Sequence, residues 1–342
     1  MRKRWTALLL AAALTLTLAA CGGTEQEPED DRLQVVATLF PYYDIARAIA
    51  GDRAEVTLLV SAGRESHSYE PTPMDIIRIG QADLFLYNGG TDETWAAEVL
   101  ASNAHGLAIP MLEQVETLAE ETVEGMQSQR GHGHDHDDHD LDDCLDPDDH
   151  LDDDHDDHDH DDHAHEIEYD EHIWTSPVNA MTIARVTAEA MMQTDPVNAA
   201  YYEENLQRYL AALRALDQEL RAVVENGQRR LIVLGDRFPL LYFCREYGLD
   251  YRAAFSGCST ETEPSAATMA YLIDRVREER IPCVYYLENS SARVAEAIAE
   301  ASGAEPCLIY SCQTVSPADF QAGETYLSLM ERNVAALRKG LN

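Results

Sequence analysis

The segment from Pro196 to Glu225 carries a regular apolar stripe, and no other feature constrains the fold as strongly. The stripe is spaced 4-3-4-3-4-3 along the sequence and consists of Tyr202, Leu206, Tyr209, Leu213, Leu216, Leu220 and Val223. Residues at this spacing lie on one face of an α-helix, so the segment predicts a long helix with one buried face. About 30 helical residues extend about 45 Å. We therefore expect this helix to run along two lobes and to fix their separation.

Short β-branched runs alternate with helical stretches on both sides of this helix. Before it, the pattern predicts strands at 35–39, 55–60, 84–87 and 107–109, and helices at 42–50, 73–79 and 93–101. After it, the pattern predicts strands at 231–234, 250–254, 284–287 and 306–310, and helices at 239–247, 264–279, 291–301 and 326–338. This rhythm is typical of a parallel sheet covered by helices. We predict an α/β fold of two parallel-sheet lobes, with a ligand site in the cleft between them.

The length of the chain indicates how many domains it has, and its charge excludes one class of partner. Its 342 residues suit about two domains. We place an N-terminal lobe at residues 33–176, linking helices at 177–226 and a C-terminal lobe at 227–342. The 25 Lys and Arg against 63 Asp and Glu give a formal charge of −38. Nucleic acid is excluded as a partner, because phosphate binding needs clustered basic residues.

Residues 131–165 carry much of this charge and most of the histidines. The segment contains 17 Asp and ten of the 13 histidines. These histidines are His132, His134, His136, His139, His150, His155, His158, His160, His163 and His165. Because it has no periodic apolar face, we expect the segment to be disordered without metal. One alternative is that the segment only increases solubility. Asp residues alone would do that, so the histidines favour an accessory loop that gathers metal ions.

The N-terminus predicts export. Met1–Arg4 is basic, and Ala7–Ala20 is an apolar run shorter than the ~20 residues of a spanning helix. We therefore predict a signal peptide at residues 1–20. Its Leu-Ala-Ala-Cys end resembles a bacterial lipobox, and we expect Cys21 to be lipidated, although an ordinary cleavage site is the alternative. Residues 21–32 then form a polar tether that holds the exported protein at the extracytoplasmic face of the cell membrane.

Five cysteines other than Cys21 and Cys144 lie in the C-terminal third: Cys244, Cys258, Cys283, Cys307 and Cys312. Outside the cytoplasm, one or two disulfides are expected. We expect the pair Cys258–Cys312, because both residues are at loop positions flanking the cleft. The sequence alone leaves the connectivity open.

Three histidines lie outside residues 131–165, namely His67, His105 and His172. His67 follows a predicted strand, at the carboxyl edge where α/β proteins place ligands. His172 directly precedes the helix that begins at Pro177. A single loop histidine is usually a surface residue. In an exported chain with a histidine-rich tract, however, these two indicate a metal ion.

Several motifs together resemble a known family. They are the lipobox at Cys21, His67–Pro73 (HSYEPTP), Glu171–Pro177 (EHIWTSP), Gly235–Pro239 (GDRFP) and the closing helix from Tyr326 to Met330. They resemble the zinc and manganese solute-binding lipoproteins of ABC transporters, the cluster A-I (or cluster 9) family. The resemblance covers essentially the whole mature chain, and the His/Asp-rich loop marks the zinc-uptake branch.

The resemblance implies a metal ion between the lobes, held by two histidines and two residues of the C-terminal lobe. The histidines carry over onto His67 and His172. The third ligand is usually His in zinc binders and Glu in manganese binders, and it falls on Asp236. This departure weakens the zinc assignment, because a carboxylate can bind either metal. Manganese is therefore the alternative cargo.

The fourth ligand of the family is a carboxylate at the end of a late strand. Here that strand ends Ile309–Gln313 and has no acid. We place the fourth ligand at Glu288, with Glu261, Glu263 or water as alternatives. Asp236 and Glu288 each also fit a purely structural role, as the cap of a helix.

The leading hypothesis is a non-enzymatic binding protein that captures Zn²⁺ and delivers it to an ABC permease and its ATPase subunit, acting as a monomer. One alternative is a metal-dependent hydrolase, since two histidines and a carboxylate with an open position also describe a hydrolase site. The sequence contains no HExxH, GxSxG or P-loop motif. The other alternative is an extracellular metal buffer or adhesin, in which residues 131–165 would carry the function.

Overall fold

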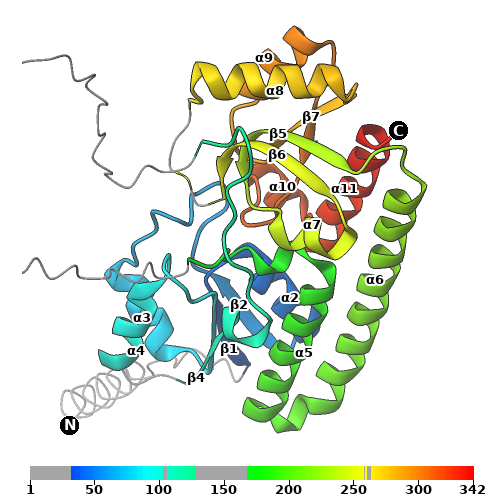
Figure 1. The fold of residues 1–342 in the computed structure, drawn as a ribbon. Helices are drawn as coiled ribbons and strands as arrows, with labels where there is room; N and C mark the ends of the chain where they lie inside the picture. The colour runs from blue at the N-terminus through cyan, green and yellow to red at the C-terminus, as the bar shows by residue number, and fades with distance from the viewer. Residues whose placement is uncertain (1–31, 103–105, 128–167, 258, 260–262) are drawn as a thin grey trace, which may run out of the picture. The chain divides into compact units, whose positions relative to one another are not determined.

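The computed structural model describes residues 32–102, 106–127, 168–257, 259 and 263–342 (Figure 1). The predicted signal peptide with Cys21, nearly all of the tether, the whole of the 131–165 segment, His105 and Cys258 lie outside these residues. Among the described residues, no helix is long and apolar enough to cross a membrane.

The first half of the chain forms a sheet of four parallel strands in the order β2-β1-β3-β4. The strands are β1 (Leu33–Ala37), β2 (Ala54–Leu58), β3 (Leu84–Tyr87) and β4 (Leu107–Pro110). The crossover helices are α2 (Phe40–Ala50), α3 (Pro73–Gln81) and α4 (Thr94–Ser102). We call this sheet and its helices the N-terminal lobe. The loops that leave β2 and β3 at their carboxyl ends carry residues of the site described below.

The second half repeats this plan in the order β6-β5-β7-β8, again all parallel. The strands are β5 (Leu231–Phe238), β6 (Asp250–Ser256), β7 (Cys283–Leu287) and β8 (Glu305–Ile309). The helices are α7 (Leu241–Tyr247), α8 (Ala266–Glu278), α9 (Arg293–Ser302), α10 (Pro317–Ala322) and α11 (Tyr326–Gly340). We call this sheet and its helices the C-terminal lobe. The predicted α/β fold with two parallel sheets is confirmed.

The long predicted helix is α6 (Ala199–Asn226), 28 residues that follow α5 (Pro177–Thr194) after a short 3-10 turn. All seven residues of the apolar stripe are buried. The helix packs against α2 and α5 and also against α7 and α11 (Figure 1). It therefore contacts both lobes, and one contiguous hydrophobic core extends from the N-terminal lobe through α6 into the C-terminal lobe. A second core lies between the other face of the C-terminal sheet and helices α8 and α9.

Two details differ from the sequence-based expectation. The strand expected at 231–234 continues to Phe238, with a register irregularity between Leu234 and Arg237. Asp236 therefore lies inside β5 and does not cap a helix. The short helix α10 was not expected; it begins at Pro317 and is capped by Ser316, whose hydroxyl accepts a hydrogen bond from the Asp319 amide.

Candidate metal site

His67 lies on the loop between β2 and α3. The end of this loop is fixed by a capping box, in which the Thr72 hydroxyl accepts from the Asp75 amide and the Asp75 carboxylate accepts from the Thr72 amide. Tyr69 is buried and its hydroxyl also donates to Asp75, at 3.0 Å. The loop is thus anchored just beyond His67, whose side chain is only 8% exposed.

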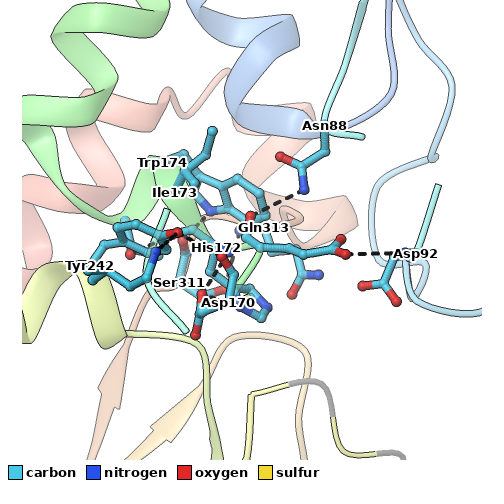
Figure 2. A network of polar contacts seen from close by, with 12 residues as sticks. Asn88, Asp92, Asp170, His172, Ile173, Trp174, Tyr242, Ser311 and Gln313 are labelled. Atoms are coloured by element: carbon cyan, nitrogen blue, oxygen red, sulfur yellow. Dashed lines mark hydrogen bonds and ion pairs between the residues drawn. The ribbon is translucent and has the colours of Figure 1, made fainter. Parts of the chain in front are cut away.

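His172 lies just before α5 and is fully buried. Ser176 caps α5 and Pro177 occupies its first turn, so the helix begins abruptly after this segment. The segment is held from both lobes (Figure 2). The Asn88 side chain donates to the Glu171 carbonyl (3.2 Å), and the Trp174 indole donates to the Ser311 carbonyl (2.9 Å). His172 is therefore fixed at the boundary of the two lobes.

The two imidazoles lie together, and each has a carboxylate at Nδ1. Their ring centroids are 5.6 Å apart. Nδ1 of His67 contacts the Asp92 carboxylate, and Nδ1 of His172 is 3.1 Å from Oδ1 of Asp170. A carboxylate on Nδ1 favours the tautomer in which Nδ1–H donates and Nε2 keeps its lone pair. Both rings therefore present Nε2 as the nitrogen available for a cation.

The surroundings of the two Nε2 atoms differ. Nε2 of His172 is buried and has no hydrogen-bond partner within the described part of the chain. Gly257 lies against this ring, and a Cβ at that position would be 3.2 Å from His172 Cε1 and 2.9 Å from the Phe238 carbonyl oxygen. Nε2 of His67 is 3.0 Å from the side-chain amide of Gln313, which also donates to Ser66 (2.6 Å). A buried nitrogen with an unused lone pair fits a metal ligand.

A tight turn after β3 places a carboxylate network behind these rings. Gly89 and Gly90 both have φ of +82°, a conformation that favours glycine. A Cβ on Gly90 would also lie 2.3 Å from Glu171 Oε1. Glu171 Oε1 accepts from the Thr91 hydroxyl (2.9 Å) and the Asp92 amide (3.3 Å). The turn therefore wraps around Glu171 and fixes Asp92 beside His67.

Asp236 lies across the site, in β5. Its Oδ1 accepts from the Arg237 amide (2.8 Å), and its Oδ2 accepts from the Leu287 amide (3.1 Å) and the Ser290 hydroxyl. Oδ2 therefore ties β5 to the end of β7, whereas Oδ1 accepts only within β5. Asp236 and His67 nevertheless line one cavity of about 820 Å³. Glu263, an alternative ligand from the sequence, lines the same cavity, whereas Glu261 lies outside the described residues.

Glu288 directly follows β7 and is buried. Its carboxylate accepts from the Ser311 amide (2.8 Å), the Ser311 hydroxyl (2.8 Å) and the Cys312 amide (2.7 Å). Burial raises the pKa of Glu288 to about 7, even though these hydrogen bonds favour the ionised form. Glu288 therefore holds the loop that carries Gln313, and both of its oxygens are engaged in doing so.

The electrostatic environment of the imidazoles suits a cation. Burial opposes the charge of His172, but the Asp170 carboxylate, with Asp92 and Glu171, raises the pKa of His172 above its ordinary value. Burial opposes the charge of Asp92 too, and contact with His67 lowers the pKa of Asp92. These buried carboxylates give the site a negative field that a divalent cation would neutralise.

The structure brings His67 and His172 together, whereas the carboxylates of Asp236 and Glu288 accept hydrogen bonds from the surrounding backbone. Among the described residues, no three His, Cys, Asp or Glu side chains form a group that could hold a metal ion. The sequence reasoning missed Gln313, Asp92 and Asp170. Asp170 lies only two residues before His172 and could have been identified from that spacing.

Cys312 is a free, buried thiol in the structure. This does not fit the expected Cys258–Cys312 disulfide, and Cys258 itself lies outside the described residues. Cys312 does lie on the loop after β8, but its side chain is fully buried in the core and its amide donates to Glu288.

Comparison with known proteins identifies relatives along nearly the whole chain. The chain is 32% identical to the high-affinity zinc uptake system protein ZnuA of Bacillus subtilis, over all of this chain and 99% of that protein. It is 30% identical to the zinc-binding lipoprotein AdcA of Streptococcus pneumoniae, over 97% of this chain and 60% of that protein.

A solved structure shows the same fold. The Zn(II)-bound ZnuA-like domain of Streptococcus pneumoniae AdcA matches 91% of this chain and 99% of its own, with 26% identity and a TM-score of 0.69. The family model described as "Zinc-uptake complex component A periplasmic" matches residues 35–340. These relatives are components of metal uptake, not enzymes, which removes the hydrolase alternative. By its sequence, its fold and the extent of this match, the chain belongs to the periplasmic component A family of zinc-uptake complexes.

Proposed function

We propose that this chain is the extracytoplasmic solute-binding component of an ABC transporter, and that it captures Zn²⁺ between its lobes and delivers it to the permease. The observation that carries the proposal is the pair His67 and His172. Each ring is anchored through Nδ1 by a carboxylate, and the Nε2 of His172 is buried and unpartnered within the described residues. Such carboxylate–histidine pairs are the usual second shell of zinc sites.

His67 and His172 would bind the ion through Nε2, and the C-terminal lobe would complete the shell. Gln313 is the nearest candidate, because rotating its amide would place Oε1 near His67 Nε2 in place of the nitrogen. Asp236 stays a candidate because it lines the cavity beside His67 and its Oδ1 accepts only from the Arg237 amide, although its Oδ2 is engaged by Leu287 and Ser290. Glu288 is the weakest candidate, and we propose that it positions the Gln313 loop. Water would fill an open position.

The donor set favours zinc over manganese. Two neutral imidazoles are borderline-soft ligands that suit Zn²⁺, whereas Mn²⁺ prefers carboxylate and water oxygens. The sequence-based reason to keep manganese open was Asp236, and in the structure its Oδ2 is engaged in joining β5 to the end of β7. Manganese remains the alternative cargo that the experiment below distinguishes.

Export and a lipid anchor would bring the chain to its permease. Cleavage before Cys21 and its lipidation would hold the protein at the outer face of the cell membrane, next to the permease and its ATPase subunit. Residues 131–165 would collect zinc near the site as an accessory. The contiguous core around α6 favours a stiff monomer whose lobes tilt only modestly when the ion enters or leaves.

The experiment is the uptake of radioactive zinc, with radioactive manganese in parallel, by host cells whose own copy of the chain is replaced by variants. We expect His67→Ala combined with His172→Ala to abolish high-affinity zinc uptake, and His105→Ala to leave it unchanged. Deletion of residues 131–165 should slow uptake at limiting zinc without abolishing it. Normal zinc uptake by the double histidine variant would contradict the proposal, and loss of manganese uptake alone would favour manganese as the cargo. Uptake that depends on the 131–165 segment alone would favour the metal-buffer alternative.

A further inference from the structure

Cys283 and Cys307 form a close pair away from the metal site. They lie on the neighbouring parallel strands β7 and β8, and their Sγ atoms are 2.6 Å apart. A disulfide bond is ~2.05 Å long, so these sulfurs are only about half an ångström beyond bonding distance. Cys283 is fully buried and Cys307 is 8% exposed. Neither side chain takes part in the metal site described above.

Helix α11 covers the face of the sheet on which the pair lies. Tyr285, two residues after Cys283 and hence on the same face of β7, donates its hydroxyl to the Ala336 carbonyl of α11 (3.2 Å). Near the end of α11, Lys339 forms an ion pair with Glu305 of β8. Contact with Cys283, aided by the charge of Lys339, lowers the pKa of the Cys307 thiol. A thiol with a lowered pKa is the reactive partner in disulfide exchange.

We propose that Cys283 and Cys307 join as a disulfide once the chain is exported, with a low-molecular-weight or protein disulfide as the oxidant. The proposal rests on the export argued above but not on zinc binding. The Cys307 thiolate attacks the oxidant disulfide, forms a mixed disulfide and releases one thiol. The Cys283 sulfur then attacks Cys307 Sγ and releases the second thiol. The two protons of the cysteine thiols go to the two released thiols, so the oxidant gains the electron pair that the cysteines lose.

The bond would fasten the edge of the C-terminal sheet. Strand β8 lies at that edge and pairs only with β7 among the described strands. It leads directly into the loop of Ser311 and Gln313, which meets Glu288, Trp174 and His67. A covalent link at Cys307 would therefore keep the strand that supports this loop from fraying.

The test is peptide mapping of the exported full-length chain, extracted in detergent and alkylated without reduction. Digestion with trypsin and chymotrypsin separates Cys307 from Cys312, because cleavage occurs at Tyr310. We expect a linked peptide that contains Cys283 and Cys307, complete after treatment with oxidised glutathione. Alkylation of both thiols, before and after this treatment, would overturn the proposal, and so would a link from Cys307 to any other cysteine.

Thermal unfolding gives a second readout. Reduction of the wild-type chain should lower Tm by roughly 5 °C or more, since a loop of this length gains stability from closure. The C283S/C307S variant should show the lower Tm from the start and no response to reductant. The matched control is Cys244→Ser, another buried cysteine, which should keep the response. The mapping on wild-type protein decides the proposal even where the double variant fails to fold.

Discussion

The side chains on the two sides of the candidate metal site differ in their hydrogen bonds. On one side, His67 and His172 are each anchored through Nδ1 by a carboxylate. On the other side, the carboxylates of Asp236 and Glu288 accept backbone amides and serine hydroxyls on all their oxygens. Both sides contain residue types that bind zinc. Of these four side chains, only His172 has a buried donor atom, Nε2, without a hydrogen-bond partner in the described part of the chain, while Nε2 of His67 faces the amide of Gln313.

We propose that this difference distinguishes residues that bind the metal ion from residues that stabilise the fold around it. A buried acid that accepts two or three hydrogen bonds stabilises the loops around it, and removing it leaves unpaired amides. A buried imidazole with one anchored and one unpartnered nitrogen contributes little to the fold through that second nitrogen. His67 and His172 should therefore determine the affinity for zinc. Asp236 and Glu288 should contribute mainly to the free energy of unfolding.

The largest effect is expected from the histidines. His172→Ala should lower zinc affinity roughly 1,000-fold, because it removes the one Nε2 that is both buried and unpartnered in the described chain. Competition with a fluorescent zinc chelator measures this on the chain lacking residues 131–165. The control is His105→Ala. An affinity of His172→Ala within 3-fold of the wild-type value would contradict the assignment of His172 as a zinc ligand.

The pH dependence of stability tests the buried acid behind the histidines. Burial raises the pKa of Glu93 to about 7, against hydrogen bonds from the Gly89 and Asn88 amides that lower it. The folded chain thus holds a proton that the unfolded chain releases near the ordinary value of 4.5. The free energy of unfolding should therefore fall by up to about 3 kcal/mol as the pH rises from 4.5 to 7.

Glu93→Gln removes this contribution and should make the fall across that window smaller, leaving the part due to Glu288, whose pKa burial also raises to about 7. Urea unfolding of the metal-free protein at pH 5 and pH 8 measures it. Glu98→Gln, an exposed acid on α4, is the matched control and should keep the wild-type profile. A stability that rises between pH 5 and pH 7 in wild type and not in Glu93→Gln would contradict the assignment.

The carboxylates on the Nδ1 atoms should have a moderate effect on binding. Asp92→Asn and Asp170→Asn keep the shape but remove the charge that fixes each tautomer, so each should weaken zinc binding about 10-fold or more. Isothermal titration with a competing chelator measures the affinity. Asp83→Asn, an acid of the same lobe remote from the site, should have no effect; equal losses in all three variants would indicate a general charge effect.

The smallest effect on binding is expected at Asp236. Asp236→Asn should cost about 1–3 kcal/mol of stability, because one side-chain oxygen that accepts from the Leu287 amide or the Arg237 amide is lost. Zinc affinity should change less than 3-fold. Urea unfolding and zinc titration of the same sample compare the two quantities. A loss of affinity as large as that of His172→Ala, with stability retained, would show that Asp236 is a ligand after all.

Most of the fold follows from the sequence pattern. The 4-3 spacing from Tyr202 to Val223 predicted α6, because an α-helix brings residues at that spacing onto one face and a strand does not. The strands were predictable because apolar β-branched runs between helices belong to a buried parallel sheet. The continuation of β5 through Gly235 and Asp236 was not, because polar residues within a strand resemble its end.

Only the two histidines of the candidate site could be predicted from the sequence. The residues that contact them lie far from them along the chain. His67 and His172 stand out because few histidines lie outside residues 131–165, and each occupies a loop at the edge of a predicted element. Asp92 is 25 residues from His67 and Gln313 is 246 residues from it, so only the fold reveals these contacts. Nor does a sequence show that an oxygen of Glu288 is already bound to the Ser311 amide.

The most direct measurement is elemental analysis of the chain with residues 131–165 deleted, equilibrated with equal zinc and manganese and then desalted. We expect about one equivalent of zinc, no manganese, and no retained metal in the His67→Ala, His172→Ala double variant. Manganese in place of zinc would overturn the assignment of the cargo. Retention of zinc by the double variant, or no metal in the parent chain, would contradict a site built on these two imidazoles.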